Sequence, residues 1–318
     1  MNLKKYYLIA LMLLGLLSAS CRKLVTDELP DMEARPVINS FFRSDEPIKI
    51  QLSLTSGFNY EELKLIDSAL VYLEENGTIK DTLTCFGDGI YTSDFIPVAN
   101  NRYRCLANYK DMAVAVAECR MPVKQEIISI TQVDNAGIDK EGISYPAIHL
   151  EFTNDPSELL YFEVVVKLIR EYNNYVWNEE NGNLDKSTDT LIDIPALINI
   201  TDPLILNEGL PLPVFSNELI EGSSYTMTLN YTTGSYSEDN TGKHTHLYPV
   251  VVELRSISYE YYRFVKQLYL YEQGRYPNVF GDVLRSFRLY SNVENGYGIF
   301  AAYSTCISDT IIPESVNN

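Results

Sequence analysis

A strict alternation of apolar and polar residues constrains the fold of this chain most. Ile48, Ile50, Leu52 and Leu54 are each separated by one polar residue. Successive side chains of a β-strand point to opposite faces of the sheet, so this segment is predicted to be a strand with one buried face. Tyrosine, which is common on half-buried β-surfaces, occurs 24 times. The sequence therefore predicts a mainly β protein.

The segment 35–122 is predicted to be an immunoglobulin- or fibronectin-like β-sandwich, because six or seven short strands are separated there by turn residues. The other predicted strands of this segment are Val37–Phe42, Ala69–Glu74, Thr78–Cys85, Arg102–Tyr109 and Ala113–Arg120. The predicted turns are Asn76-Gly77, Asp88-Gly89, Asn100-Asn101 and Lys110-Asp111. Tyr103-x-Cys105 resembles the tyrosine corner of immunoglobulin-like domains.

The segment 123–318 is predicted to form a second β-sandwich-like domain. Its predicted strands are Ile127–Val133, Ala147–Phe152, Tyr161–Tyr172, Thr226–Thr232, Leu247–Leu254, Phe287–Tyr290 and Gly298–Cys306. A polar insertion at residues 173–190 is predicted to be a loop.

One amphipathic helix is predicted over residues 259–273 of the second domain. Ser258 is its expected N-cap, and Gly274 its expected end. An aromatic and aliphatic stripe at helical spacing is expected to pack on a sheet: Tyr261, Phe264, Val265, Leu268 and Tyr271.

Residues 1–20 have the pattern of a secretory signal peptide. Lys4 and Lys5 precede an apolar run from Leu8 to Leu17, and small residues follow directly before Cys21. The small residues and the cysteine resemble a bacterial lipobox, so Cys21 is predicted to be lipidated and to anchor the protein in a membrane. The alternative is an ordinary cleaved signal. Residues 21–34 are predicted to be an acidic tether, and sorting to the outer membrane is expected, with its periplasmic and cell-surface faces both left open.

The charge of the chain argues against nucleic acid as a partner. Its 25 Lys and Arg residues face 43 Asp and Glu residues, giving a formal charge of −18, whereas nucleic-acid affinity comes largely from basic side chains. The sequence contains neither the G-x-S-x-G nor the H-E-x-x-H motif. We therefore predict that the protein is not an enzyme and has no catalytic residues.

Three exposed-looking aromatic residues are the predicted ligand-binding surface. Tyr172, Tyr175 and Trp177 lie close together at the polar insertion, beside several asparagines. Flat aromatic rings of this kind could bind a glycan or peptide, and the alternative is a loop whose aromatic rings fold back onto the sheet. Calcium is considered as a cofactor for the acidic loop Asn178–Asp185, which does not match the EF-hand pattern. No other cofactor is expected.

The two clustered histidines do not define a metal site. His244 and His246 would share a strand face, but a zinc site needs a third ligand from elsewhere, and none is predicted.

Cys85 and Cys105 both occupy apolar strand positions, and a disulfide between them is our first expectation. Buried free thiols are the alternative.

Several segments together resemble the family called domain of unknown function 4249. They are Pro36–Phe41, Ser68–Leu73, Tyr103–Pro122, Val252–Tyr262 and, most specifically, Ser291–Tyr303. The resemblance covers nearly the whole chain after Cys21. It implies an outer-membrane lipoprotein, often encoded beside a TonB-dependent transporter, with no agreed catalytic residues. We therefore expect a non-catalytic accessory or binding component of a TonB-dependent uptake system. The alternatives are a surface glycan- or peptide-binding module and a structural envelope protein.

Overall fold

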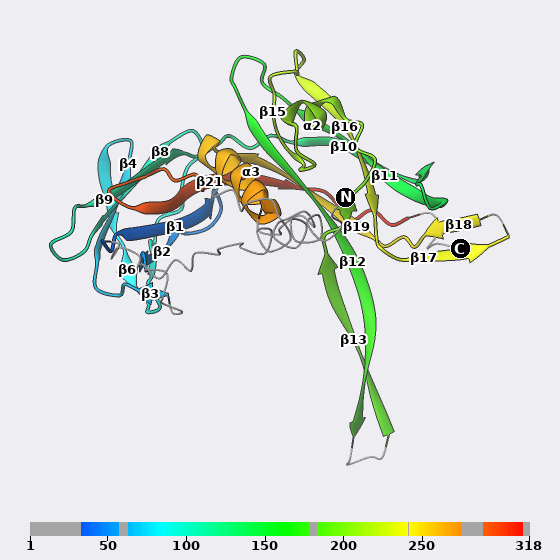
Figure 1. Cartoon of the computed structure of the whole chain (residues 1–318), viewed down its shortest axis with the longest axis horizontal. Helices are drawn as coiled ribbons and strands as arrows, with labels where there is room; N and C mark the ends of the chain where they lie inside the picture. The colour runs from blue at the N-terminus through cyan, green and yellow to red at the C-terminus, as the bar shows by residue number, and fades with distance from the viewer. Residues whose placement is uncertain (1–32, 57–62, 179–182, 241, 275–288, 314–318) are drawn as a thin grey trace, which may run out of the picture. The chain divides into compact units, whose positions relative to one another are not determined.

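The computed structural model describes residues 33–56, 63–178, 183–240, 242–274 and 289–313 (Figure 1). The described residues are mainly β, as predicted, and form three sheets that pack as β-sandwich layers. None of the helices in this part of the chain is long and apolar enough to cross a membrane. The predicted signal segment, the lipidation site Cys21 and nearly all of the tether lie outside the described residues.

Sheet A is the longest sheet and contains strands from both ends of the chain. Its main strand order is β13-β12-β19-β21-β1-β2-β7-β6, and two short strands pair with β12 and β2. The strands are β1 (Pro36–Arg43), β2 (Lys49–Leu54), β3 (Lys64–Leu65), β6 (Thr84–Cys85), β7 (Ile90–Thr92), β12 (Tyr161–Asn178), β13 (Asn183–Asp193), β15 (Val214–Ser216), β19 (Val250–Ile257) and β21 (Tyr297–Ile307). The parallel pairing of β1 with β21 joins the first predicted domain to the end of the second.

Sheet B packs on the β1–β2 part of sheet A and completes the first sandwich. Its strands are β4 (Leu70–Glu75), β5 (Thr78–Thr82), β8 (Arg102–Asn108), β9 (Ala115–Arg120) and β20 (Val293–Glu294). The core between the sheets holds fully buried Ile38, Leu52, Leu73 and Tyr103. Burial of each large aliphatic side chain stabilises the fold by about 1.5–3 kcal/mol.

The tyrosine corner predicted at Tyr103 is present. The backbone N–H of Val98 donates to Tyr103 Oη over 2.7 Å, and Tyr103 Oη donates to Glu75 Oε1 over 2.7 Å. Burial, followed by the hydrogen bond to Glu75, raises the pKa of Tyr103 to about 12. This hydroxyl therefore stays protonated at neutral pH and fixes the loop before β8 to the end of β4.

Sheet C packs on the β12–β19 part of sheet A. Its strands are β10 (Ile127–Ile138), β11 (Ile143–Thr153), β14 (Ala196–Leu197), β16 (Ser224–Thr232), β17 (Tyr236–Asp239) and β18 (Gly242–Thr245). The core between the two sheets includes Ile148, Phe152, Phe162 and Leu254, all buried. Helix α2 (Pro203–Glu208) adds two buried aliphatic residues to this core.

The predicted helix is confirmed as α3 (Tyr259–Gly274), which packs on the other face of sheet A (Figure 1). Ser258 caps it, because its Oγ accepts a hydrogen bond from the N–H of Tyr261 over 3.3 Å. Tyr261 is buried against Phe41 of β1, with ring centroids 5.1 Å apart. Helix α2, which the sequence did not predict, is tied to α3 by Glu208, whose carboxylate accepts from Lys266 Nζ over 2.6 Å.

Several strand predictions need correction. The single strand predicted over Thr78–Cys85 is split at buried Leu83, so that β5 joins sheet B and β6 joins sheet A. The insertion predicted as a loop at residues 173–190 is instead the outer part of the β12–β13 hairpin. Of the strand predicted over 287–290, residues 287 and 288 lie outside the described residues, and the nearest strand is β20.

The predicted boundary near residue 122 stays a prediction. Buried residues from Ile38 to Met121 form one core with Phe300 of β21, and those from Ile148 to Leu254 form another. Sheet A contributes strands to both cores.

Candidate functional site

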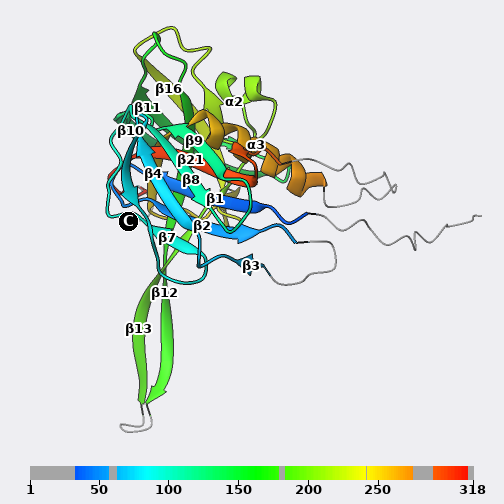
Figure 2. The same cartoon turned by 90° about the vertical axis from the view of Figure 1, so that its left-hand side faces the viewer.

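The outer part of the β12–β13 hairpin is the first candidate site. β12 pairs with β19 from Tyr161 to Leu168, and from there to Asn178 it pairs with β13. Every side chain of Glu171–Trp177 and Asn183–Ile192 is exposed. We call these two segments the arm. In two views of the molecule, the arm lies clear of the other labelled strands (Figures 1 and 2).

The arm places the three predicted binding residues on two faces. Directly opposite residues of an antiparallel pair share a face. Tyr175 lies opposite Lys186 and Trp177 opposite Leu184, whereas Tyr172 lies opposite Asp189. Because residues 172 and 175 differ by an odd number, Tyr172 faces away from the other two rings.

All three aromatic residues of the arm are exposed, as the binding hypothesis requires. Tyr175 and Trp177 are each 59% exposed, Tyr172 is 46% exposed, and Leu184 beside Trp177 is 58% exposed. Exposed apolar side chains that gather on one face are typical of contact surfaces. Tyr175, Trp177 and Leu184 therefore form a small apolar patch, which we call the arm patch.

Polar contacts hold the arm in register. Thr188 Oγ1 donates to Asn173 Oδ1 over 3.1 Å, and Asn174 donates to Asp189. An isolated two-stranded hairpin is only marginally stable in water. The arm therefore depends on its base for a defined orientation.

Arg170 forms the contacts that hold the lower end of the arm in place. Its Nε lies 2.9 Å from Asp193 Oδ2 in the partner strand, and its Nη2 donates to the carbonyl oxygen of Thr233 over 2.8 Å. The guanidinium also lies 4.5 Å from the ring centroid of Tyr248. These contacts join the arm to the end of β16 and to the segment before β19.

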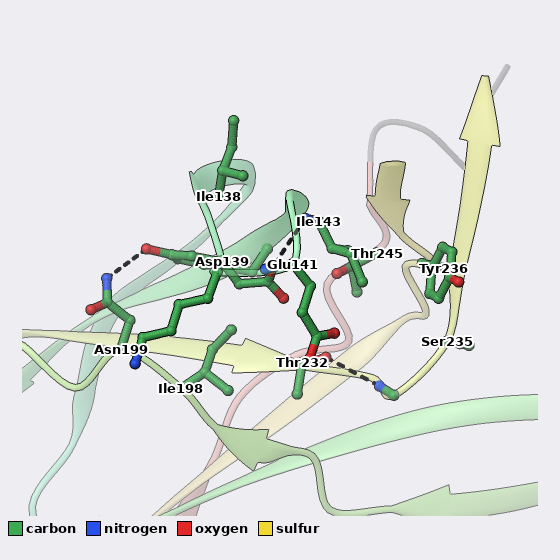
Figure 3. Close-up of a pocket in the computed structure, with 13 residues that line it drawn as sticks. Ile138, Asp139, Glu141, Ile143, Ile198, Asn199, Thr232, Ser235, Tyr236 and Thr245 are labelled. Carbon is green, nitrogen blue, oxygen red and sulfur yellow. Dashed lines mark hydrogen bonds between the residues drawn. The ribbon is translucent and has the colours of Figure 1, made fainter. Parts of the chain in front are cut away.

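A cavity of about 640 Å³ at one end of sheet C is the second candidate site (Figure 3). Its lining side chains come from the β10–β11 turn, the segment after β14, the β16–β17 turn, and β18. Those drawn in Figure 3 include Glu141, Asn199, Thr232, Ser235 and Tyr236. They offer hydroxyl, amide and carboxylate groups and one aromatic ring.

Two local features preorganise this cavity. Asp139 Oδ1 accepts from the N–H groups of Glu141 and Ile143, each over 2.9 Å, and so closes the turn. Buried Tyr145 Oη accepts from Asn199 Nδ2 over 2.6 Å. Gly137 leaves room for this hydroxyl, since a Cβ there would lie 2.3 Å from it. Sequence reasoning missed this site because its residues come from four separate segments.

The two histidine rings contact different neighbours in the structure. His244 Nδ1 lies 3.1 Å from Ser144 Oγ, and the His246 ring packs against Tyr248 with centroids 4.7 Å apart. The described part of the chain holds no group of three or more His, Cys, Asp or Glu side chains that could bind a metal. Residues 179–182 of the loop considered for calcium lie outside the described part.

The disulfide expected between Cys85 and Cys105 is not present in the structure, where both are free thiols. Cys85 lies in β6 of sheet A with its thiol 3.7 Å from Asp67 Oδ1, whereas Cys105 is fully buried in β8 of sheet B. Burial raises the pKa of the Cys105 thiol to about 12. A neutral, inaccessible thiol of this kind acts as a small core side chain.

Comparison with known proteins identifies a family. The model described as Domain of unknown function (DUF4249) matches residues 22–306. The match covers both sandwich cores, the arm, and the β20–β21 segment on which the sequence resemblance was strongest. Searches of curated proteins and of solved structures gave no match.

Proposed function

The chain belongs to the DUF4249 family, and from this premise we propose that it is an outer-membrane lipoprotein that acts as a non-catalytic accessory of a TonB-dependent uptake system. The lipid would be attached at Cys21. The transporter as partner is what the family resemblance implies.

The arm is the observation that supports this proposal best. This β-hairpin exposes Tyr175 and Trp177 and contributes to neither core. Exposed apolar side chains that gather in this way often mark contact surfaces. Tyrosine and tryptophan are enriched at the centres of protein interfaces, where they exclude water. The arm patch would contact the transporter, while the anchor keeps both proteins in one membrane.

The chemistry of the arm favours protein contact over catalysis. Its charged side chains are Glu171, Asp185, Lys186 and Asp189, and the arm patch lies on the face that also holds Lys186. An apolar centre with a mixed polar rim is the usual composition of a protein interface. The two strands would present this face to a partner without a change in the sandwich cores.

Removal of the arm patch tests the proposal. The lipidated protein is used to capture a TonB-dependent transporter from membranes of cells that express both proteins. Tyr175→Ala combined with Trp177→Ala is expected to reduce the recovered transporter at least about tenfold, because loss of two interface aromatic residues costs about 2 kcal/mol or more. The Tm should stay within about 2 °C of wild type, since both side chains are exposed.

Tyr172→Ala is the matched control, because it removes one exposed aromatic ring from the opposite face of the arm. It should leave capture unchanged. Cys21→Ser tests the anchor separately and should move the protein from the membrane to the soluble fraction. If wild-type protein recovers no transporter, the accessory role is excluded, and a structural envelope role becomes the better explanation.

The cavity at the end of sheet C favours a second function, the surface glycan- or peptide-binding module. Its volume of about 640 Å³ suits a small oligosaccharide or peptide. Tyr236, which is 54% exposed, offers a ring for stacking, and Asn199 offers an amide. We expect Tyr236→Ala to weaken binding of a cellotriose or tri-alanine probe at least about fivefold by calorimetry. The double arm variant should bind as wild type does, and no binding of either probe would exclude this function.

A further inference from the structure

A hollow on the outer face of sheet B gathers three guanidinium groups in an otherwise acidic protein. It has a volume of about 550 Å³. Its charged lining residues are Glu74, Arg102, Arg104, Glu118 and Arg120. Three positive and two negative groups give the hollow a net charge of +1, whereas the chain has −18. The alternation of β8 explains the placement, because Tyr103 between the arginines points into the core.

The position of Arg104 is explained by its neighbours in the sheet. It lies directly opposite Glu74 of β4 and Glu118 of β9, and its Nη1 is 3.3 Å from Glu74 Oε2. A positive side chain between two negative ones on neighbouring strands stabilises a sheet modestly. This part of the hollow needs no ligand.

Arg102 and Arg120 are not explained in this way. They lie directly opposite one another on β8 and β9. Like charges in directly opposite positions destabilise a sheet. Among the described residues, the ion pair of Arg102 with Glu118 is the one that either arginine forms, so the two guanidinium groups share a single counter-ion. A like-charge pair that is only partly compensated is expected chiefly at functional sites.

The loops around this pair hold both arginines in place. The backbone N–H of Arg102 donates to Asn76 Oδ1 over 3.0 Å, and its Nε lies 3.2 Å from Glu118 Oε1. Arg120 donates from Nε to the carbonyl oxygen of Asn100 over 3.3 Å and from Nη2 to the side chain of Asn100. Asn100 has a φ of +73°, the left-handed conformation that lets the loop turn back toward Arg120.

We propose that Arg102 and Arg120 form a binding site for a phosphate group. The planar guanidinium matches the geometry of phosphate oxygens, and one dianion would neutralise both members of the like-charge pair. Among the described residues, the contacts given above use Nε of Arg102 and Nε and Nη2 of Arg120. They do not involve Nη1 and Nη2 of Arg102 or Nη1 of Arg120, so these nitrogen atoms can donate to a ligand. The ligand is a small phosphorylated molecule or the headgroup of a phospholipid.

Calorimetric titration of the purified chain with pyrophosphate at low ionic strength tests the site. We expect a Kd of about 1 mM or tighter. Arg102→Gln and Arg120→Gln should each weaken binding at least about tenfold, because each removes charge-assisted hydrogen bonds. Arg43→Gln is the matched control, since Arg43 in β1 is paired with Asp45 and Glu46 outside the hollow and its loss changes the net charge equally. It should leave binding within about twofold of wild type.

Thermal unfolding without ligand supplies a second readout that distinguishes binding from a structural role. Arg120→Gln relieves the like-charge pair, so its Tm should equal or exceed that of wild type. Pyrophosphate should raise the Tm of wild type but not that of Arg120→Gln. A lowered Tm for this variant, together with no pyrophosphate binding by wild type, would overturn the proposal.

Vesicles distinguish the two sources of phosphate. The Cys21→Ser chain is mixed with phosphatidylglycerol vesicles and with phosphatidylcholine vesicles. If the protein sediments with phosphatidylglycerol vesicles but not with phosphatidylcholine vesicles, and the Arg120→Gln variant sediments with neither, the ligand is a lipid headgroup. Pyrophosphate binding without sedimentation identifies a small phosphorylated molecule. If neither probe binds, the site does not exist.

Discussion

Replacement of Gly298 by alanine is expected to destabilise the protein by about 3 kcal/mol or more. Gly298 lies in β21 directly opposite Ile38 of β1, where the two ends of the chain meet in parallel strands. Its φ is +108°, and a Cβ there would lie 2.0 Å from the Ile38 carbonyl oxygen. The substitution therefore imposes backbone strain and also pushes β1 away from β21.

Substitutions at two other glycines measure the backbone strain and the steric clash separately. Gly142 has a φ of +80° with no atom within 4 Å of the added Cβ, so Gly142→Ala should cost only the strain, about 1 kcal/mol. Gly296 has no positive φ, but its Cβ would lie 2.5 Å from the Pro36 carbonyl oxygen. Urea unfolding should rank the losses as Gly298→Ala, then Gly296→Ala, then Gly142→Ala.

The ranking would be contradicted if Gly298→Ala and Gly142→Ala had the same midpoint of urea unfolding. β1 and β21 would then adjust to the added Cβ without loss, and backbone strain would be the one cost at both positions.

Local patterns predicted the local elements of this fold. The alternation at residues 48–54 marked β2, and Asn76-Gly77 marked a tight turn in which both residues have positive φ. The aromatic stripe after Ser258 marked α3. In each case the contacts that form the element lie within a few residues of one another, so a local sequence pattern reveals the element.

The pairing of the strands and their order in the sheets could not be predicted from local sequence patterns. The pairing of β1 with β21 joins residues such as Ile38 and Gly298 that no local pattern connects. Most of the arm, residues 173–190, is predicted as a loop because its composition is polar. The side chains of β13 are exposed from Asn183 to Ile192, so the alternation of burial that reveals a strand is absent there. The Arg102–Arg120 pair depends on the register of β8 and β9, which the sequence does not specify.

Replacement of Arg255 by methionine is expected to destabilise the protein by about 3 kcal/mol at neutral pH. Arg255 lies in β19 on the face of sheet A that α3 covers. Its Nη1 donates to Glu163 Oε2 over 2.8 Å and its Nη2 to Glu253 Oε2 over 2.7 Å. Both carboxylates are largely buried. The methionine variant would therefore remove the cation paired with Glu163 and one of the two cations paired with Glu253.

Two neighbouring groups limit the loss. Tyr261 Oη donates to Glu163 Oε2 over 2.8 Å, and Lys167 forms an ion pair with Glu253. Each carboxylate therefore keeps one partner. Arg255→Met combined with Glu163→Gln should recover part of the stability, because it removes one of the two stranded charges.

The pH dependence of unfolding distinguishes this electrostatic loss from simple loss of packing. Burial raises the pKa of Glu253, but hydrogen bonds from Lys167 and Arg255 outweigh burial and hold it below its ordinary value of 4.5. A carboxyl group with a lowered folded-state pKa stabilises the protein above its unfolded pKa, and this contribution is lost as the pH falls through the folded value. Wild type should therefore lose stability below about pH 4.5.

In Arg255→Met, burial acts on Glu253 with one cation fewer, so its folded-state pKa should rise. The difference in free energy of unfolding between wild type and variant should then be largest near pH 7 and shrink toward pH 4, as the stranded carboxylates take up protons. Urea unfolding at a series of pH values measures this difference. A difference that stays constant from pH 7 to pH 4 would mean that Arg255 stabilises the fold by packing against Tyr303, 5.4 Å away, rather than by charge.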